Sequence, residues 1–535
     1  MFLAAFVWIL YHPVTRLWWM DDDLFHLHFL SMHSALEYCF SPRVCRLMSD
    51  NLFTPLPYVS YSLDLALFGR SPAAFHAHQL LALFLAAAAL HAAFRRWLSP
   101  SLSAFAASFF VLGIPSAFWV LDLMLRHYLE GLIWAALALI CFVEAIRRRR
   151  PGLSILSSVF YFAAMSEKEI YVPLFVFFLF LPEGSWRGRL RLLRWHVVAL
   201  LMYLGWRWVM LGTLLGGSGW AIRPREIPRL LASLPVRIGD KIFSGPPVFI
   251  AILLGCVLAG AAWLAWRRRG TLNVAALSAI LILSPLLPAA QSTDERFGML
   301  PWLLISVLFV FGCQDLLATS FRARRAAVLL LLVGFSAAFI CNRVDWRKKY
   351  AWATQMSTEG RFFLSMLPGD LLRHPRIPPA AMNETRWFKE ESLGLPKGSG
   401  WFADDVYLCG AASPAARVWE YDATQARVRE VTAEVRSAAI RYCSSLRLSA
   451  PLRAEFESLG NVVFWHLGPY SEGRYSFVLR KGIESFAVPA EAGYQALPKN
   501  LSLMVRYASP AGWITFSPEL TMDFQSTARF RWERP

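Results

Sequence analysis

The chain has 535 residues, a mean hydropathy of +0.42 and a formal net charge of +17. Apolar residues make up 56% of it and come in long uninterrupted runs, which excludes an ordinary soluble domain. The basic excess is arginine in short loops between these runs. The positive-inside rule of membrane proteins explains that placement, so we expect no nucleic-acid partner.

About 11 apolar runs are long enough to cross a hydrocarbon layer roughly 30 Å thick as helices. The first, at the N-terminus, has neither a basic segment before it nor a small-residue cleavage site after it, so we expect a membrane helix rather than a cleaved signal peptide. The runs lie near residues 2–19, 73–94, 102–121, 128–146, 152–166, 169–182, 195–212, 247–266, 272–290, 298–313 and 325–342.

Arginine clusters occur after every second predicted span from the second onward. They lie at residues 95–96, 147–150, 187–194, 267–269 and 322–325. An even number of crossings separates each from the next, so all five share one face, which should be cytoplasmic. The N-terminus is then expected to be cytoplasmic, and the tail from about residue 343 extracytoplasmic.

The apolar stretch 152–182 is interrupted by the charged tetrapeptide 166–169. One long helix would bury three charges near mid-membrane, at about 2.5–3.5 kcal/mol each. It would also place two arginine clusters on the wrong face. We therefore predict two short helices that meet at the tetrapeptide, inside a cavity lined by protein.

Loop 212–246 opposes the charge rule, because it is predicted to lie outside the cytoplasm yet is basic. Its apolar residues recur at helical spacing, which predicts an amphipathic helix at the membrane surface. Two interpretations remain open: a helix that rests on lipid headgroups, or a basic lid over an anionic lipid substrate.

On this topology, ionisable residues gather at the outer ends of the spans. One such residue alone is usually an ordinary loop residue, but charges beside the membrane are functional hypotheses, and four groups on one face strengthen that hypothesis. The groups are Asp21, Asp22 and Asp23; Asp122, Arg126 and His127; Glu167, Lys168 and Glu169; and Asp294, Glu295 and Arg296.

These residue types suit group transfer from a phosphate. Adjacent carboxylates repel one another, so one of the three aspartates can act as a general base toward a hydroxyl. Asp21 and Asp23 also have the spacing of a two-carboxylate clamp for a divalent cation such as Mg²⁺ or Mn²⁺. Lys168, Arg126 and Arg296 can stabilise a phosphate leaving group. His26 and His28 nearby fit either a transition-metal pair or ordinary interfacial histidines.

Several passages together resemble a known family. They are Asp22-Asp23, the stretch 54–76 (TPLPYVSYSLDLALFGRSPAAFH), residues 115–126, Lys168-Glu169, and Glu295-Arg296-Phe297 followed by Leu300-Pro301. Their order over residues 20–345 resembles GT-C-type multi-span glycosyltransferases that use polyprenyl-phosphate sugars. The branch they most resemble is the bacterial relatives of the transmembrane O-mannosyltransferases.

The resemblance implies an all-α GT-C-like domain over residues 1–342, in a bacterial inner membrane. It implies inverting sugar transfer from a polyprenyl-phosphate donor to an extracytoplasmic protein or glycan acceptor. Asp22 or Asp23 would be the base, and Lys168, Arg296 and Arg126 would hold the donor phosphate. The expected supporting residues are Asp21, Glu169, Glu295 and His127.

This sequence also departs from the family's pattern. The first span is short, Asp21 is an extra aspartate, and the tail lacks tetratricopeptide spacing. Two other functions compete with sugar transfer: a lipid or solute transporter or flippase, and a non-catalytic membrane scaffold. We find no internal repeat of the kind transporters show, and the polar groups lie at one face instead of mid-span.

Residues 343–535 predict a mixed α/β extracytoplasmic domain, either a cap over the active face or an acceptor-binding module. Cys409 and Cys443 are expected to form a disulfide if the compartment is oxidising, and Cys39 could likewise pair with Cys45. Helices are expected at 352–367 and 423–444, and strands at 461–466, 475–479, 501–507 and 513–516.

Overall fold

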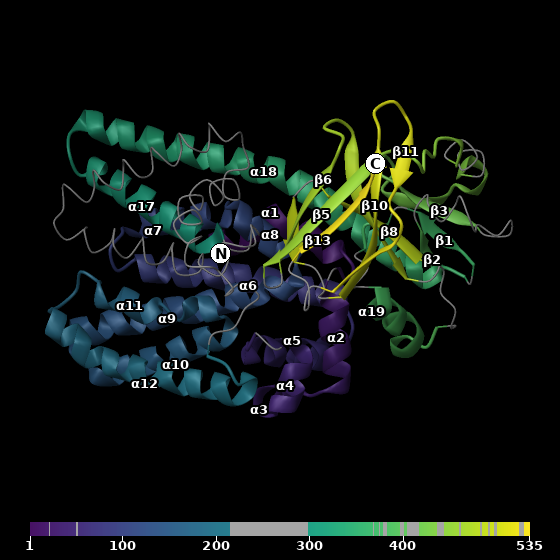
Figure 1. The fold of residues 1–535 in the computed structure, drawn as a ribbon. Helices are drawn as coiled ribbons and strands as arrows, with labels where there is room; N and C mark the ends of the chain where they lie inside the picture. Colours follow the sequence, from purple (N-terminus) through teal and green to yellow (C-terminus); the bar gives the residue numbers. More distant parts are fainter. Residues whose placement is uncertain are drawn as a thin grey trace. The chain divides into compact units, whose positions relative to one another are not determined.

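The structure is a computed structural model that forms two compact units (Figure 1). Within the described residues, the membrane unit comprises 1–17 and the stretches between 29 and 350, and the C-terminal unit comprises 18–28 and residues after 350. The structure describes residues 1–20, 22–49, 52–214, 298–367, 369–373, 375–377, 382–395, 401–403, 417–435, 443–459, 462–481, 484–490, 493–496, 500–523 and 529–535.

The membrane unit is helical throughout its described part. Many of its helices begin with proline in the first turn, where the missing N–H would have no partner anyway. The helices are α1 (Phe2–Tyr11), η1 (His12–Arg16), α2 (Asp23–Met32, which begins in the C-terminal unit), α3 (Ala35–Phe40), α4 (Pro42–Met48), α5 (Pro55–Phe68), α6 (Pro72–Phe94), α7 (Pro100–Val111), α8 (Ile114–Leu121), η2 (Leu123–Leu125), α9 (Arg126–Arg148), α10 (Pro151–Glu167), η3 (Glu169–Tyr171), α11 (Leu174–Leu179), α12 (Trp186–Leu211), α17 (Met299–Leu317) and α18 (Phe321–Ser365).

Three described helices are long and apolar enough to cross a membrane: α6, the segment Leu123–Arg148, and α18. The bent pair α7–α8 would make a fourth. The predicted total of about 11 spans is therefore not confirmed, and the spans expected at 247–266 and 272–290 lie outside the described residues. The first span was predicted too long, because α1 ends at Tyr11. Pro13 has no N–H and its ring would clash with the preceding turn of an α-helix.

Two helix faces of the membrane unit expose apolar side chains. On α12 these include Leu201 and Met202, and on α18 they include Leu329 and Leu332, each about 60% exposed or more. Contiguous apolar surface of this kind is costly in water and stable against lipid. The opposite sides of the helices pack inward, where α10 lies between α9 and α12.

The charged tetrapeptide interrupts its apolar stretch as predicted. Helix α10 ends at Glu167, Lys168 has an extended backbone (φ −158°, ψ 137°), and the chain continues through η3 into α11. Gly131 on α9 is needed for this return, because an added Cβ there would lie 2.3 Å from the ring of Tyr171. The prediction of two short helices is confirmed.

The pair α7–α8 bends by 59° at Leu112-Gly113. A bend leaves the last carbonyl groups of α7 without helical partners. The Tyr11 hydroxyl donates to the Val111 carbonyl (2.8 Å), and the Phe110 carbonyl accepts from the Gly113 N–H (3.0 Å), the Ser116 hydroxyl (2.8 Å) and Trp302 Nε1 (3.0 Å). The Gly113 carbonyl accepts from the Ala117 N–H (3.1 Å) and from Asn342 Nδ2 (3.4 Å).

The described residues of the C-terminal unit form three sheets (Figure 1). One has the order β2-β1-β3-β4, with parallel pairs β1–β2 and β1–β3. The second has the order β11-β10-β7-β8, with β12 also on β10, and the third β13-β5-β6-β9. The strands are β1 (Leu371–Arg373), β2 (Trp401–Ala403), β3 (Val418–Asp422), β4 (Arg427–Glu430), β5 (Leu452–Leu459), β6 (Val462–Gly468), β7 (Arg474–Lys481), β8 (Glu484–Pro489), β9 (Tyr494–Ala496), β10 (Asn500–Ala508), β11 (Ile514–Phe516), β12 (Leu520–Asp523) and β13 (Arg529–Arg534).

The second and third sheets share one core, so they form a sandwich. Phe456 and Trp465 of the third sheet pack with Phe477, Val505 and Met522 of the second. Burial alternates along β10, where Leu503, Val505 and Tyr507 are buried, whereas all three residues of β11 are buried. Four of these strands were predicted, from alternation or from residues that favour strands. All four are confirmed as β6, β7, β10 and β11.

The helix predicted at 423–444 is wrong over its first part. Residues 423–426 form a turn, and β4 follows and pairs with β3. Asp422 Oδ1 accepts the N–H groups of Thr424 (2.8 Å) and Gln425 (3.3 Å), an Asx-type turn that reverses the chain. These hydrogen bonds to Asp422 stabilise a turn at the position where the spacing of apolar residues predicts a helix. Earlier in this unit, the short helix α19 (Met382–Trp387) is followed directly by the π-helix η7 (Phe388–Ser392).

The cysteine predictions had different outcomes. Cys443 is disulfide-bonded, but Cys409 lies outside the described residues, so that pairing stays a prediction. Cys39 and Cys45 are free, so the second pair is wrong. Cys39 Sγ lies 3.8 Å from the carbonyl oxygen of Pro55, whereas Cys45 belongs to the hydrophobic core.

The predicted domain boundary at 342/343 falls inside α18. That helix continues unbroken to Ser365, and the two units divide after Tyr350. Residues 18–28 belong to the C-terminal unit, although they lie near the start of the sequence.

Candidate functional site

Several arginine-bearing loops meet at one end of the membrane unit. Arg147 donates to Glu183 (3.0 Å) and to the Arg96 carbonyl (3.0 Å), and Gln314 near the end of α17 donates to the Trp97 carbonyl (3.2 Å). The clusters at 95–96 and 147–150 therefore share this end with the loop that leads into 187–194 and with the turn before 322–325. We call it the arginine end. The cluster at 267–269 lies outside the described residues.

The opposite end of the same helices gathers polar side chains, and we call it the polar end. Arg207, near the end of α12, pairs with Glu169 (2.6 Å). Tyr171 donates to the Tyr128 carbonyl at the start of α9 (2.6 Å). The chain thus leaves the arginine end along α10, turns at Lys168, and returns to Glu183.

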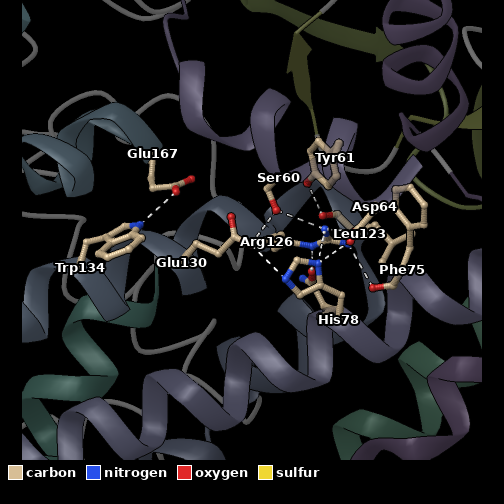
Figure 2. A network of polar contacts seen from close by, with 11 residues as sticks. Ser60, Tyr61, Asp64, Phe75, His78, Leu123, Arg126, Glu130, Trp134 and Glu167 are labelled. Atoms are coloured by element: carbon tan, nitrogen blue, oxygen red, sulfur yellow. Dashed lines mark hydrogen bonds and ion pairs between the residues drawn. The ribbon is translucent and has the colours of Figure 1, made fainter. Parts of the chain in front are cut away.

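Arg126 is the centre of a buried network at the polar end (Figure 2). Its side chain is 1% exposed and forms an ion pair with Asp64, which is 2% exposed. The guanidinium also donates to Gln79 Oε1 (3.1 Å) and to the Phe75 carbonyl (3.1 Å). It lies over the ring of Tyr61, 4.8 Å from the centroid.

Two further polar residues connect this network to Glu130. His78 Nδ1 lies 2.8 Å from Asp64 Oδ1, and its Nε2 lies 3.6 Å from Glu130 Oε1. Ser60 donates to the same Glu130 oxygen (2.8 Å). The spacing explains how the partners meet: Ser60 and Asp64 are one turn apart on α5, and Arg126 and Glu130 are one turn apart on α9.

Glu167 lies on the neighbouring helix and is nearly buried (Figure 2). Trp134 Nε1 donates to its Oε1 (3.3 Å), whereas Oε2 has no hydrogen-bond partner among the described residues. Burying a carboxylate that is not fully hydrogen-bonded costs free energy, which makes Glu167 a candidate functional residue.

Lys168 is partly exposed at the break after α10, between two carboxylates of different environment. Its Nζ lies 5.6 Å from the ring centroid of Tyr128, within cation–π range. Glu169 on its other side accepts from Arg207 and from the backbone N–H of Phe53 (3.3 Å). The lysine is thus supported by an aromatic ring at a fixed break in the membrane helices.

The predicted base residues that the structure describes lie in the C-terminal unit, in a segment that we call the aspartate turn: residues 18–20 and 22, followed by the first residues of α2 (23–28). Asp23 is 1% exposed, and its carboxylate accepts the backbone N–H of Met20 (2.8 Å). Asp22 is exposed. Of the two, Asp22 is therefore the one accessible from outside the fold, while Asp23 shapes the turn.

The remaining predicted site residues divide into three groups. His127 is half-buried against the Tyr128 ring (centroids 4.5 Å apart). Arg126 donates to protein groups in this conformation, which is the arrangement of a structural cation. Asp21, Glu295 and Arg296 lie outside the described residues. Within the part of the chain that is described, no group of three or more His, Cys, Asp or Glu could hold a metal ion. The Asp21–Asp23 clamp stays a prediction.

Sequence reasoning missed Asp64, His78, Glu130 and Arg207. A signal was available for all four. Glu130, His78 and Arg207 are ionisable residues inside the predicted spans 128–146, 73–94 and 195–212, and Asp64 lies within the stretch 54–76 that carried the family resemblance.

Comparison with known proteins identifies only distant structural similarity. No protein-family model matches the chain, and no curated protein matches it. It is similar to two crystal structures of ArnT from Cupriavidus metallidurans, one bound to undecaprenyl phosphate and one in the apo state. Sequence identity is 14% to each, the matches cover 69% and 70% of this chain and 83% of each ArnT chain, and the TM-scores are 0.36 and 0.35. Likeness this slight carries no argument about activity.

Proposed function

We propose that the chain is an integral-membrane glycosyltransferase that moves a sugar from a polyprenyl-phosphate donor to an extracytoplasmic acceptor with inversion. The observation that supports this most is Lys168, a cation at a break between apolar helices, beside a buried carboxylate and over an aromatic ring. A polyprenyl phosphate needs that combination: an apolar surface for its chain and a cation for its headgroup.

The proposed chemistry needs a base for the acceptor hydroxyl and a cation for the leaving phosphate. Asp22 accepts the proton of the acceptor hydroxyl, whose oxygen attacks the anomeric carbon of the sugar. The bond to the phosphate oxygen breaks on the opposite side, so configuration inverts. Negative charge grows on the departing phosphate, and Lys168, with Arg296 as a predicted partner, stabilises that charge.

The polar end then serves as the rigid support of the donor site. The Arg126–Asp64 pair fixes α5, α6 and α9 together, so the residues at the start of α9 keep their positions. We propose that the polar end faces away from the cytoplasm, because the arginine end lies opposite and basic loops favour the cytoplasmic side.

The test uses the purified full-length protein in nanodiscs with a panel of polyprenyl-phosphate hexoses, mannose included, labelled in the sugar. Transfer to water or to added glycolipid releases unsubstituted polyprenyl phosphate, which is measured directly. Lys168→Ala should weaken donor binding and lower release by at least about 10-fold, and Lys168→Arg should retain more of both, since it keeps the charge.

Arg148→Gln is the matched control, since it also removes a cation from the membrane unit, at the arginine end, where the side chain is 62% exposed. It should leave release unchanged. A folded protein that cleaves no donor of the panel would exclude this function. Movement of intact donor across a vesicle without cleavage would instead favour the flippase.

A further inference from the structure

The aspartate turn is bound to a defined platform within the C-terminal unit. The backbone N–H of Trp18 donates to Ser357 Oγ (2.7 Å), and the Trp18 ring contacts Phe388 edge-on (centroids 5.6 Å apart). The ring also lies against Gly360, where an added Cβ would come within 2.3 Å of it. The beginning of the turn is therefore fixed by the end of α18 and by η7.

The other end of the turn is fixed by α19. His28 Nδ1 lies 2.6 Å from Glu384 Oε2, and since a carboxylate only accepts, the imidazole donates. The His28 ring also stacks on Trp387, with centroids 4.3 Å apart and planes 18° apart. A hydrogen bond and a stacked ring together fix both the position and the rotation of the imidazole.

The two anchors lie on either side of the proposed base. Trp18 precedes Asp22 by four residues and His28 follows it by six, while the Asp23 carboxylate closes the turn between them through Met20. Asp22 itself is exposed, and the two anchors fix the chain on either side of it.

We propose that His28 and Glu384 are positioning residues, which hold the aspartate turn so that Asp22 keeps the geometry its role requires. This inference rests on the proposed function and adds a role for the C-terminal unit, which would carry the base of the transfer reaction. A misplacement of about 1 Å can lower the rate about 100-fold, so the pair should act on turnover and leave donor affinity unchanged.

The test compares variants that separate the hydrogen bond from the ring. Glu384→Ala and His28→Phe remove the hydrogen bond, and His28→Phe keeps the stacking on Trp387. Glu384→Gln keeps an acceptor and His28→Asn keeps a donor near the Nδ1 position, so both should recover part of the loss. Met32→Ala is the control, because Met32 lies on the same helix and is 66% exposed.

We expect Glu384→Ala and His28→Phe to lower kcat for sugar transfer about 10- to 100-fold at unchanged KM for the donor. The double variant Glu384→Ala/His28→Phe should lower kcat no further than either single variant, because both single variants remove the same His28–Glu384 hydrogen bond. Amide exchange in residues 22–28 should rise in the same variants. Unchanged kcat and unchanged exchange in Glu384→Ala would overturn the proposal.

The outcomes separate this inference from the proposed function. If Asp22→Asn abolishes transfer while Glu384→Ala is neutral, the base is supported and the positioning pair fails. If Asp22→Asn transfers sugar at the wild-type rate, the proposed base fails. In that case amide exchange alone decides whether His28 and Glu384 hold the turn, and unchanged exchange rejects the pair.

Discussion

Replacing Asp64 by alanine should destabilise the membrane unit more than any surface change. Asp64 and Arg126 are both nearly inaccessible, so the replacement leaves a guanidinium buried without its carboxylate. Removing one partner of a buried ion pair costs about 3–5 kcal/mol. The hydrogen bonds of Arg126 to Gln79 and to the Phe75 carbonyl remain, and they hold the cost near the lower limit.

Two further variants separate charge from shape. Asp64→Asn keeps an oxygen acceptor and removes only the charge, so it should cost about 1.5–3 kcal/mol, the value of a hydrogen bond to a charged group. The double variant Asp64→Leu/Arg126→Met leaves no unpaired charge. It should be more stable than Asp64→Ala, because apolar pairs often replace buried ion pairs without loss.

Thermal unfolding of the purified protein in detergent measures these differences. Arg148→Gln is again the control, and its exposed pair with Glu144 should contribute about 0.3–0.5 kcal/mol. A loss below about 1 kcal/mol for Asp64→Ala would refute the account of Arg126 as a structural cation. If Arg126→Met weakened donor binding at unchanged stability, Arg126 would be a phosphate ligand, as the sequence predicted.

Three other changes have expected outcomes. Gly360→Ala should increase amide exchange in the aspartate turn, because the new Cβ would overlap the Trp18 ring. In a Trp18→Ala background, Gly360→Ala should cause no further increase, and a further increase would contradict the proposed overlap. Hydrogen bonds from Thr424 lower the pKa of Asp422, so the ionised carboxylate stabilises the β3–β4 turn above about pH 4, and this stabilisation is lost as pH falls through the lowered pKa. Amide exchange at residues 423–426 measures the loss, and Asp422→Asn should remove the pH dependence. In sealed cells that express a variant of the protein without its native free cysteines, a cysteine placed by Arg149→Cys should not react with a membrane-impermeant maleimide. Reaction from outside would reverse the proposed topology.

What could be predicted from the sequence depended on local signals. The break at Lys168 followed from the cost of charges in a membrane, and the strands around Trp465 and Phe477 followed from alternation; both are confirmed. The first helix was predicted too long because Pro13 was given too little weight. The helix over β4 was predicted because the turn at Asp422 was not recognised.

The contacts of the candidate site could not be predicted in the same way. Asp64 and Arg126 are 62 positions apart, and His28 and Glu384 are 356 apart. Each pair forms because separate helices pack, and no periodicity within one helix encodes the partner. The sequence indicated which residues were unusual for their surroundings, and the packing determined which of them meet.

The bend between α7 and α8 can form early during synthesis of the membrane unit. Tyr11, which serves the Val111 carbonyl, is already made when the bend leaves the ribosome. Trp302 and Asn342, which serve the Phe110 and Gly113 carbonyls, are translated roughly 200 residues later, on the order of 10–40 s at 5–20 residues per second. The same two carbonyls also accept within the bent pair: that of Phe110 from the Gly113 N–H (3.0 Å) and the Ser116 hydroxyl (2.8 Å), and that of Gly113 from the Ala117 N–H (3.1 Å). The bend therefore satisfies its own backbone in lipid before the last two helices are made, and chains truncated before Trp302 should already contain it.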